Sequence, residues 1–460
     1  MVGFDFETSP IEEYRSEERA ALDAHKAAIT GVSLSVSEDS GIYIPLRHRA
    51  GRNIQKPEAV MDYLRQAVFE NATVIKVAHN LAFESMFLYA LGVIVQPPCY
   101  DTIAAAQLTL KSSTTFRGLS DSGLKTLVPQ LFHVELPDFE TVTAGRFFDE
   151  LDPQDKETVR YACADSDYAL RLYHLFNGWF DQYLPRHRRI VEQIESPTSV
   201  YCGLMRYNGL LMDRAAMEAK QAEAEERISA IREEIAFLIG DVEIGANAST
   251  SAFKSYLYKD LGLPVVKTTA KYQEAADDET MILLAAWCRE NRPELTRLFE
   301  LVQEYRRWGK IKGTYLDGYL RHINSATGRI HPDLMPLGTE TGRFAARNPN
   351  LQNMPRKGSD PIGIRNMLVA PEGYQVMELD YSQIELRVGA FYCRDARMLE
   401  TYRGGGDIHA QTTSVIYNIP IEQAADKSAA ELQRTSRAIA KGCNFWLLLR
   451  PVAPRVCNGH

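Results

Sequence analysis

Asp380 follows an apolar segment, residues 374–379, that is typical of a β-strand. A segment with helical spacing begins directly after it, at Ser382. A carboxylate held at a strand end suits a Mg²⁺ site for phosphoryl transfer, because Mg²⁺ prefers hard oxygen ligands and leaves room for phosphate oxygens. This strand, aspartate and helix therefore predict an α/β fold with a metal-dependent site.

The chain has 460 residues, 24% of them charged and 45% hydrophobic. That length predicts two or more domains with substantial cores, and the composition is ordinary for a globular protein. No apolar run is long enough to span a bilayer and no leader precedes the first strand, so a cytoplasmic protein is expected. The cysteines are scattered and never spaced C-x-x-C, which predicts reduced thiols rather than a zinc site or a disulfide framework.

Charge is unevenly distributed along the chain. The net charge is −8, and the acidic excess lies in residues 1–185, which hold 26 acidic and 16 basic side chains. Residues 341–370 hold five basic side chains against the single acid Asp360. A local basic stripe matters more for phosphate binding than the overall sum, so this segment predicts contact with DNA.

Short apolar strands alternate with helices at first, which predicts an α/β layer, and the pattern then becomes helical. A long amphipathic helix without Gly or Pro is predicted at 215–239. The predicted domains are 1–185 and 186–460, the latter helical in 186–325 and α/β in 326–460. The other predicted strands are 2–6, 29–37, 42–45, 72–78 and one near Arg329, and the other predicted helices lie within 249–261 and 278–304.

Five side chains predict a first site. Asp5 and Glu7 alternate along one strand and point to the same face, and Glu84 lies at the start of a helix. Tyr161 and Asp165 are spaced i, i+4 on one helical face. Four converging acids would repel one another unless cations bind, so two Mg²⁺ or Mn²⁺ ions are expected, which would activate a water and stabilise a leaving 3′ oxygen. The Tyr161 hydroxyl would orient that water.

These elements resemble the three exonuclease motifs of the DEDDy 3′–5′ exonucleases, over about residues 1–180. That group includes the proofreading domains of the family-A DNA polymerases. The resemblance implies a ribonuclease H-like fold. Each motif is common by chance, but their ordered occurrence around His79 and Asn80 is not. Glu84 stands where the family has aspartate, so we expect weakened or repositioned metal binding at that ligand.

A second set of segments resembles the polymerase domain of the same family. Residues 377–387 (MELDYSQIELR) are similar to motif A of the family-A DNA polymerases, and T-G-R at 341–343 and N-P-N-L-Q-N-M-P at 348–355 match its DNA-binding signature. A polymerase must grip any sequence, so it should contact phosphates and minor-groove acceptors. The predicted DNA-binding residues are Arg343, Asn350, Gln352 and Asn353.

The same resemblance implies nucleotide-binding residues. His409 would face the phosphates of the incoming nucleotide, and Glu385 would act as a gate against the ribose 2′-hydroxyl. Arg437, Lys441 and Phe445, spaced i, i+4 and i+8, resemble motif B. The Arg437 and Lys441 side chains would neutralise the charge of the triphosphate, and the Phe445 ring would contact the sugar and base of the nucleotide.

The end of the chain departs from the family pattern. Tyr-Gly and a later second palm carboxylate are expected, but Leu449-Arg450 stand in their place and the sequence ends at His460. Two-metal nucleotidyl transfer needs both carboxylates, so the polymerase site is expected to be incomplete. We interpret residues 446–460 as an out-of-frame tail, because a one-base shift at Trp446 can restore the family pattern.

The sequence therefore predicts a family-A DNA polymerase of a phage or bacterium with an N-terminal 3′–5′ exonuclease. The expected partners are DNA primer–template, single-stranded DNA 3′ ends and deoxynucleoside triphosphates, with the chain acting as a monomer. One alternative is a stand-alone 3′–5′ exonuclease whose C-terminal half only binds DNA, and another is an inactive DNA-binding fragment. A ribonuclease acting on RNA 3′ ends ranks last, because it leaves the polymerase-like segments unexplained.

Overall fold

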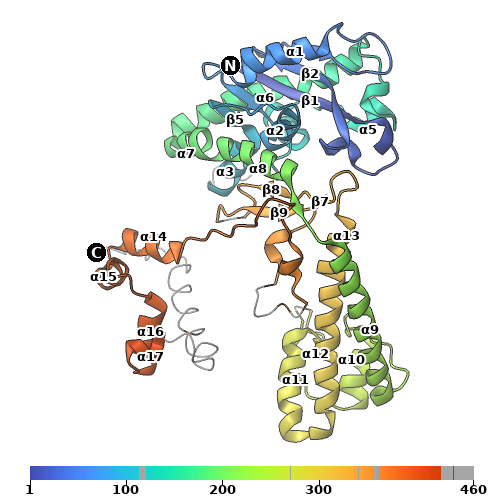
Figure 1. Cartoon of the computed structure of the whole chain (residues 1–460), viewed down its shortest axis with the longest axis vertical. Helices are drawn as coiled ribbons and strands as arrows, with labels where there is room; N and C mark the ends of the chain where they lie inside the picture. The colour runs from blue at the N-terminus through green and yellow to red at the C-terminus, as the bar shows by residue number, and fades with distance from the viewer. Residues whose placement is uncertain are drawn as a thin grey trace. The chain divides into compact units, whose positions relative to one another are not determined.

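A computed structural model describes residues 1–112, 121–269, 271–339, 341–355, 360, 362–425 and 439. The chain divides into two compact units between Gln375 and Val376. Each unit is described by itself below. The elements are labelled in Figure 1.

The N-terminal region, residues 1–208, is built on one mixed sheet (Figure 1). Its strand order is β3-β2-β1-β4-β5, with β1 antiparallel to β2 and parallel to β4. The strand β2 is antiparallel to β3, and β4 is parallel to β5. The strands are β1 (Val2–Pro10), β2 (Ala27–Ser35), β3 (Ile42–Pro45), β4 (Lys76–Ala78) and β5 (Cys99–Asp101). The strand predicted at 42–45 is thus present with the predicted bounds, those predicted at 2–6, 29–37 and 72–78 are present with shifted ends, and the prediction missed β5.

Helices cover this sheet. The long helix α6 (Lys156–Tyr183) packs on β1 and β2, while α2 (Leu81–Ala90) packs on β4 and on α8 (Ser196–Asn208). A side-chain oxygen of Asp155 caps α6 by accepting from the backbone N–H groups of Glu157 and Thr158, each at 3.2 Å. The other helices are α1 (Pro57–Leu64), α3 (Thr102–Ser112), α4 (Leu124–Phe132), α5 (Phe139–Thr143) and α7 (Pro185–Ile190).

Alternation along β1 separates a core face from a polar face. Phe4 and Phe6 pack their rings on Phe69, with centroids 5.1 and 5.9 Å away. The intervening carboxylates point the other way, because successive strand side chains alternate. The close approach of α6 depends on Gly3, where a Cβ would lie 2.4 Å from the Ser166 carbonyl oxygen.

The helical lobe, residues 214–321, holds a separate hydrophobic core that includes Ile231, Phe253 and Phe299. The predicted long helix is α9, and the predicted segment 278–304 is two helices because Pro293 cannot continue the first. The segment predicted at 249–261 is α10 followed by a π-helical turn, Tyr256–Asp260. The bounds are α9 (Arg214–Ile239), α10 (Ser251–Ser255), α11 (Asp278–Asn291), α12 (Thr296–Lys310) and α13 (Asp317–Arg321).

Two small ladders are formed by segments on either side of this lobe in the sequence. The strand β6 (Leu210–Leu211) pairs with β7 (Arg329–Ile330), which is the strand predicted near Arg329, and β8 (Asp333–Met335) pairs with β9 (Ala345–Arg347). The prediction missed β6, β8 and β9, because two- and three-residue strands carry little periodic signal.

The second unit is helical where it is described: α14 (Ile384–Cys393), α15 (Ala396–Arg403), α16 (Ile408–Tyr417) and α17 (Ile421–Ala425). The strand predicted at 374–379 is wrong. These residues have no regular secondary structure, and all six are exposed. A strand needs a neighbour to satisfy its backbone groups, and no described strand pairs with this segment.

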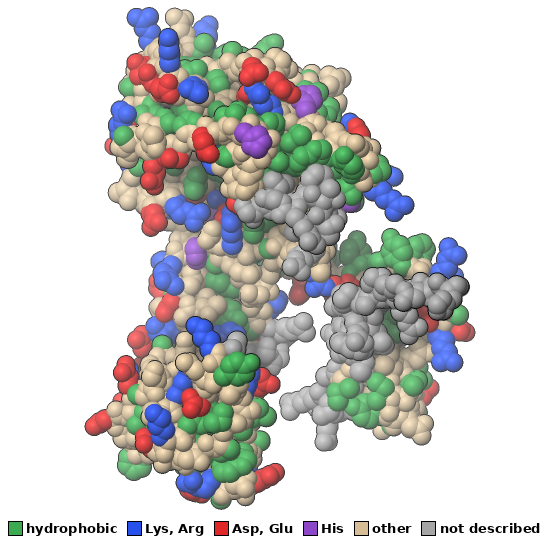
Figure 2. All heavy atoms as spheres, turned by 180° about the vertical axis from the view of Figure 1, so that it is seen from behind, with side chains coloured by type: hydrophobic (Ala, Val, Ile, Leu, Met, Phe, Trp, Pro, Cys, Tyr) green, Lys and Arg blue, Asp and Glu red, His purple; other side chains and the backbone are tan. Residues whose placement is uncertain are grey.

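Acidic and basic side chains are interspersed with apolar ones over the face in Figure 2. Among the described residues, no helix is both long and apolar enough to cross a membrane.

Candidate functional site

Two carboxylates of the predicted first site project from β1. Glu7 is 7% exposed, and Asp5 is half-buried. Burial raises the pKa of Asp5 well above its usual range, and the nearby Asp165 raises it further. The pKa of Glu7 is also raised, first by burial and then by Asp5 and Asp165. The two groups therefore lie in a buried, negatively charged environment.

Glu84 enters from the first turn of α2. Asn80, just before this helix, has a φ of 80°, the left-handed region that asparagine tolerates. A carboxylate in a first turn is stabilised by the helix dipole. Glu84 is nevertheless 2% exposed, and its pKa is raised by burial, by Asp5 and by Glu7. Its Oε2 atom has no hydrogen-bond partner among the described residues.

A fifth carboxylate, the buried Asp101, supports this arrangement and was missed by the sequence analysis. It lies at the end of β5, and its Oδ1 atom accepts from the backbone N–H groups of Asn80 at 3.2 Å and Ile103 at 3.0 Å. Asp101 thereby fixes the start of the helix that carries Glu84. The available signal was an aspartate at the end of the short apolar run Cys99-Tyr100.

The helix α6 supplies Tyr161 and Asp165. Tyr161 is 6% exposed, and its ring packs 5.8 Å from that of Phe148. Asp165 forms an ion pair with Lys125 of α4, with 2.7 Å between Oδ1 and Nζ. The same Nζ atom lies 4.8 Å from the centre of the Tyr161 ring. The sequence analysis missed Lys125, which has no motif around it.

The predicted first site is thus assembled from β1, α2 and α6. Asp5, Glu7, Glu84 and Asp165 are close enough that the pKa of Glu84 is raised by each of the other three. Among the described residues, no three His, Cys, Asp or Glu side chains have the arrangement of a ready-made metal site. The donor set nevertheless fits a hard divalent cation, because it consists of carboxylate oxygens and one buried oxygen, Glu84 Oε2, lacks a partner.

The four predicted DNA-binding residues lie together on the surface of residues 343–353 and all are exposed. The Asn350 side chain accepts from the backbone N–H of Gln352 at 3.0 Å, and the Gln352 side chain donates to the Phe344 carbonyl at 3.2 Å. The hydroxyl of Tyr315 donates to the carbonyl oxygen of Asn353 at 3.0 Å. The segment is therefore tied to the helical lobe, while the four residues remain exposed to solvent.

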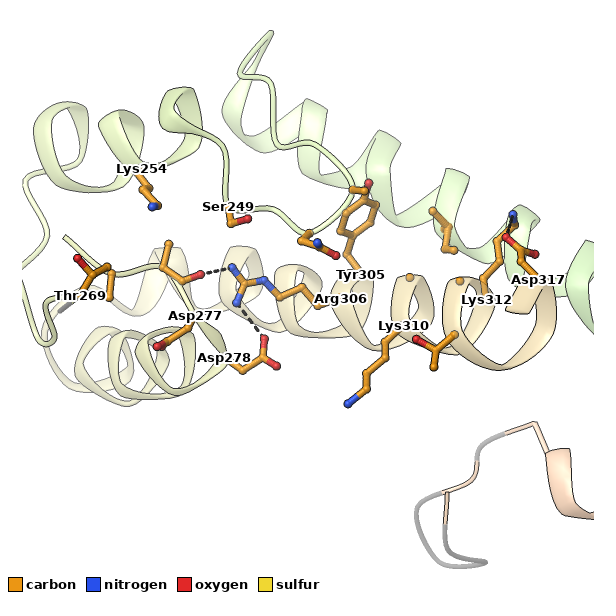
Figure 3. A pocket seen from close by; sticks show the side chains of 18 residues that line it. Ser249, Lys254, Thr269, Asp277, Asp278, Tyr305, Arg306, Lys310, Lys312 and Asp317 are labelled. Carbon is orange, nitrogen blue, oxygen red and sulfur yellow. Dashed lines mark hydrogen bonds and ion pairs between the residues drawn. The ribbon is translucent and has the colours of Figure 1, made fainter. Parts of the chain in front are cut away.

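The helical lobe contains a cavity of about 860 Å³ with a basic lining (Figure 3). Arg306 crosses it from α12 to Asp278, with 3.0 Å between Nη1 and Oδ1, and Lys312 pairs with Asp317 at 3.0 Å. Lys254 and Lys310 also line it, and within the described residues neither forms an ion pair. Part of the basic lining thus stabilises the lobe, while these two lysines leave positive charge at its surface.

The second unit contains the other predicted residues. Asp380 is exposed on the segment without secondary structure, and Glu385 is exposed on α14. His409 is 5% exposed on α16, where its backbone N–H donates to Asp407 Oδ1 at 2.9 Å. Gln383 donates to the same oxygen at 3.0 Å and so links the segment after Asp380 to α16. Arg437, Lys441, Phe445 and residues 446–460 lie outside the described residues.

Comparison with known proteins decides the family. The family profile of DNA polymerase family A matches residues 214–449. The chain belongs to DNA polymerase family A. The profile of a 3′–5′ exonuclease matches residues 1–178, which hold all five residues of the predicted first site. The predicted family and mixed α/β fold class are therefore confirmed.

Individual relatives agree with this assignment. DNA polymerase I of Pseudomonas aeruginosa is 29% identical over 97% of this chain and 47% of its own length, and that of Treponema pallidum is 29% identical over 97% and 44%. The thermostable DNA polymerase I of Thermus aquaticus is 32% identical over 58% and 30%. The chain spans about half the length or less of these curated relatives. In fold it resembles the POL domain of Pol1 from M. smegmatis in complex with DNA primer-template and dNTP, with a TM-score of 0.73, 22% identity, and coverage of 97% of this chain and 67% of that one.

Proposed function

We propose that this chain is a DNA-directed DNA polymerase with a metal-dependent 3′–5′ exonuclease that acts on single-stranded DNA ends. The observation that supports this proposal best is the group of four carboxylates from β1, α2 and α6, in which Asp5, Glu7 and Asp165 all raise the pKa of the buried Glu84. A site of that charge favours divalent cations, and phosphodiester hydrolysis is chemistry that such cations assist.

Asp5, Glu7, Glu84 and Asp165 would hold two Mg²⁺ or Mn²⁺ ions. Bound ions supply neutralisation of the phosphodiester charge and activation of a water. Tyr161 orients that water through its hydroxyl and does not remove its proton. The pKa of Tyr161 is raised, first by burial and then by Glu7 and Asp165, so the hydroxyl stays protonated at neutral pH. Its packing on Phe148 holds the ring in place.

The test uses a labelled single-stranded oligonucleotide, the full chain and Mg²⁺. Asp5→Ala should remove essentially all nucleotide release, because a carboxylate ligand to the cation is lost. Asp62→Ala is the matched control, because Asp62 lies on α1 with a side chain 55% exposed, and it should keep the wild-type rate. Equal degradation by Asp5→Ala and wild type would show that the site is assigned wrongly.

The polymerase half of the proposal rests on the family match and on the exposed group Arg343, Asn350, Gln352 and Asn353. Deoxynucleoside triphosphates and primer–template would be its partners, and the chain would act as a monomer. Binding to primer–template should weaken as salt rises, because phosphate contacts release counterions. Fluorescence anisotropy at several salt concentrations measures this, and Arg343→Ala should reduce the salt slope by about one unit.

A second candidate function is a 3′–5′ exonuclease whose remaining residues only bind DNA. The exposed position of Asp380, on a segment without strand partners among the described residues, favours it. Primer extension in an Asp5→Ala background separates the two candidates. Extension that Asp380→Ala abolishes supports the polymerase, and DNA binding without any extension supports the second candidate.

A further inference from the structure

Lys125 contacts two of the residues to which the proposed function assigns roles. Its Nζ atom donates to Asp165 Oδ1 at 2.7 Å and lies 4.8 Å from the centre of the Tyr161 ring. Tyr161 and Asp165 are one turn apart on α6, so a single ammonium group reaches both. The contact between α4 and α6 therefore places a positive charge inside the acidic site.

The position of Lys125 in its own helix is unfavourable. It is the second residue of α4, directly after Leu124, and the N-terminal end of a helix repels cations. No acidic residue lies in the first turn of α4 to offset this. The carboxylate of Asp165, on another helix, provides the compensating charge.

Lys125 also balances the charge of the other carboxylates. It lowers the pKa of Asp5, Glu7 and Asp165, against the burial that raises all three. Its side chain is 38% exposed, compared with 17% for that of Asp165. The ammonium group can therefore move into solvent without opening the packed core.

We propose that Lys125 is a positioning residue that serves as a built-in counter-ion of Asp165 when no divalent ion is bound, and that Mg²⁺ or Mn²⁺ displaces its ammonium group. This inference rests on the proposed function in one respect, the role of Asp165 as a metal ligand. An ammonium group and a divalent ion repel each other at contact distance, so they compete for Asp165 Oδ1. The lysine thus holds Asp165 and Tyr161 in place before the metal arrives.

Calorimetry of Mn²⁺ binding to the full, metal-free chain without DNA tests the competition directly. Lys125→Met removes the charge and keeps the length, so it should bind Mn²⁺ about fivefold more tightly, the fold-change expected for the loss of a partly exposed ion pair. Lys125→Arg keeps the charge and should stay near wild type. Lys156→Met is the matched control, because Lys156 is an exposed lysine at the start of α6, and it should leave the affinity unchanged.

Thermal melting provides a readout independent of binding. In EDTA, Lys125→Met should melt below wild type, because Asp165 loses its counter-ion, and in saturating Mn²⁺ this difference should vanish. Lys125→Gln, which also lacks the charge, replaces the methionine variant if that fails to fold. A Lys125→Met or Lys125→Gln chain that binds Mn²⁺ no more tightly than wild type, or is destabilised equally with and without Mn²⁺, overturns the proposal.

The two proposals fail in different ways. If wild type binds Mn²⁺ and releases nucleotides but the neutral variants bind Mn²⁺ no more tightly, only the counter-ion role of Lys125 is wrong. If wild type neither binds Mn²⁺ nor releases nucleotides, the proposed exonuclease is wrong and the counter-ion role falls with it.

Discussion

Gly3→Ala should damage both the stability of the N-terminal region and its exonuclease site. The new Cβ would lie 2.4 Å from the Ser166 carbonyl oxygen, whereas carbon–oxygen contacts normally lie at about 3.3 Å or more. The sheet and α6 must therefore separate by about 1 Å. Overpacking of this kind costs about 1–3 kcal/mol, which lowers the melting temperature of a domain of this size by roughly 2–12 °C.

The same separation moves Asp165 and Tyr161 away from the β1 carboxylates. A misplacement of about 1 Å can reduce a rate about 100-fold, so nucleotide release should fall by that order at a temperature where the variant is fully folded. Gly178→Ala is the matched control on α6. Its Cβ would have no neighbour within 4 Å, so the change should stabilise the helix by about 0.5–1 kcal/mol and leave the rate unchanged. Wild-type melting and wild-type nucleotide release in Gly3→Ala would refute the close-packing argument.

Three further predictions concern the same site. Tyr161→Phe keeps the ring packing and should lower nucleotide release by about 10²–10⁴-fold, less than Asp5→Ala; an unchanged rate in single-turnover assays would contradict the water-orienting role. Glu84→Asp should keep or raise the rate, because it restores the family's ligand; a large loss would show that the pocket requires the longer side chain. Glu84→Gln should stabilise the metal-free chain at pH 8, and the gain should shrink toward pH 5 in EDTA melts. The sign follows from the raised pKa of Glu84: its stability contribution is complete below the usual carboxyl pKa and is lost as pH rises through the folded value. A gain that grows toward pH 5 would contradict this sign.

The spacing of motifs predicted which carboxylates lie together in the proposed exonuclease site. Asp5 and Glu7 share a face because a strand alternates, and Tyr161 and Asp165 share one because a helix has 3.6 residues per turn. These local rules hold in any strand or helix, whatever its tertiary contacts. Lys125 and Asp101 could not be found in that way, because they reach the site through tertiary contacts between α4 and α6 and between β5 and α2.

The error at residues 374–379 has a related cause. An apolar pattern predicts that a segment can be a strand, but pairing decides whether it is one. The strand β1 has β2 and β4 on its two sides, whereas residues 374–379 have no strand partner among the described residues. The roles assigned to Asp380, Glu385 and His409 remain predictions, as do those of Arg437, Lys441 and Phe445.

The two halves of the proposed function therefore have different physical support. The carboxylates of the proposed exonuclease site are held in place by sheet pairing, by the close packing of α6 at Gly3 and by the Asp101 contacts at the start of α2. The pKa values of Asp5 and Glu84 are raised first by burial and then by neighbouring carboxylates, so keeping these groups ionised opposes folding. Apolar side chains at these positions would stabilise the metal-free fold more than carboxylates do. Binding of a cation would restore the free energy of folding that the buried carboxylates lose. This argues that the site is built for a metal. Asp380, by contrast, is exposed on a segment without regular secondary structure, and its proposed role rests on the family match alone.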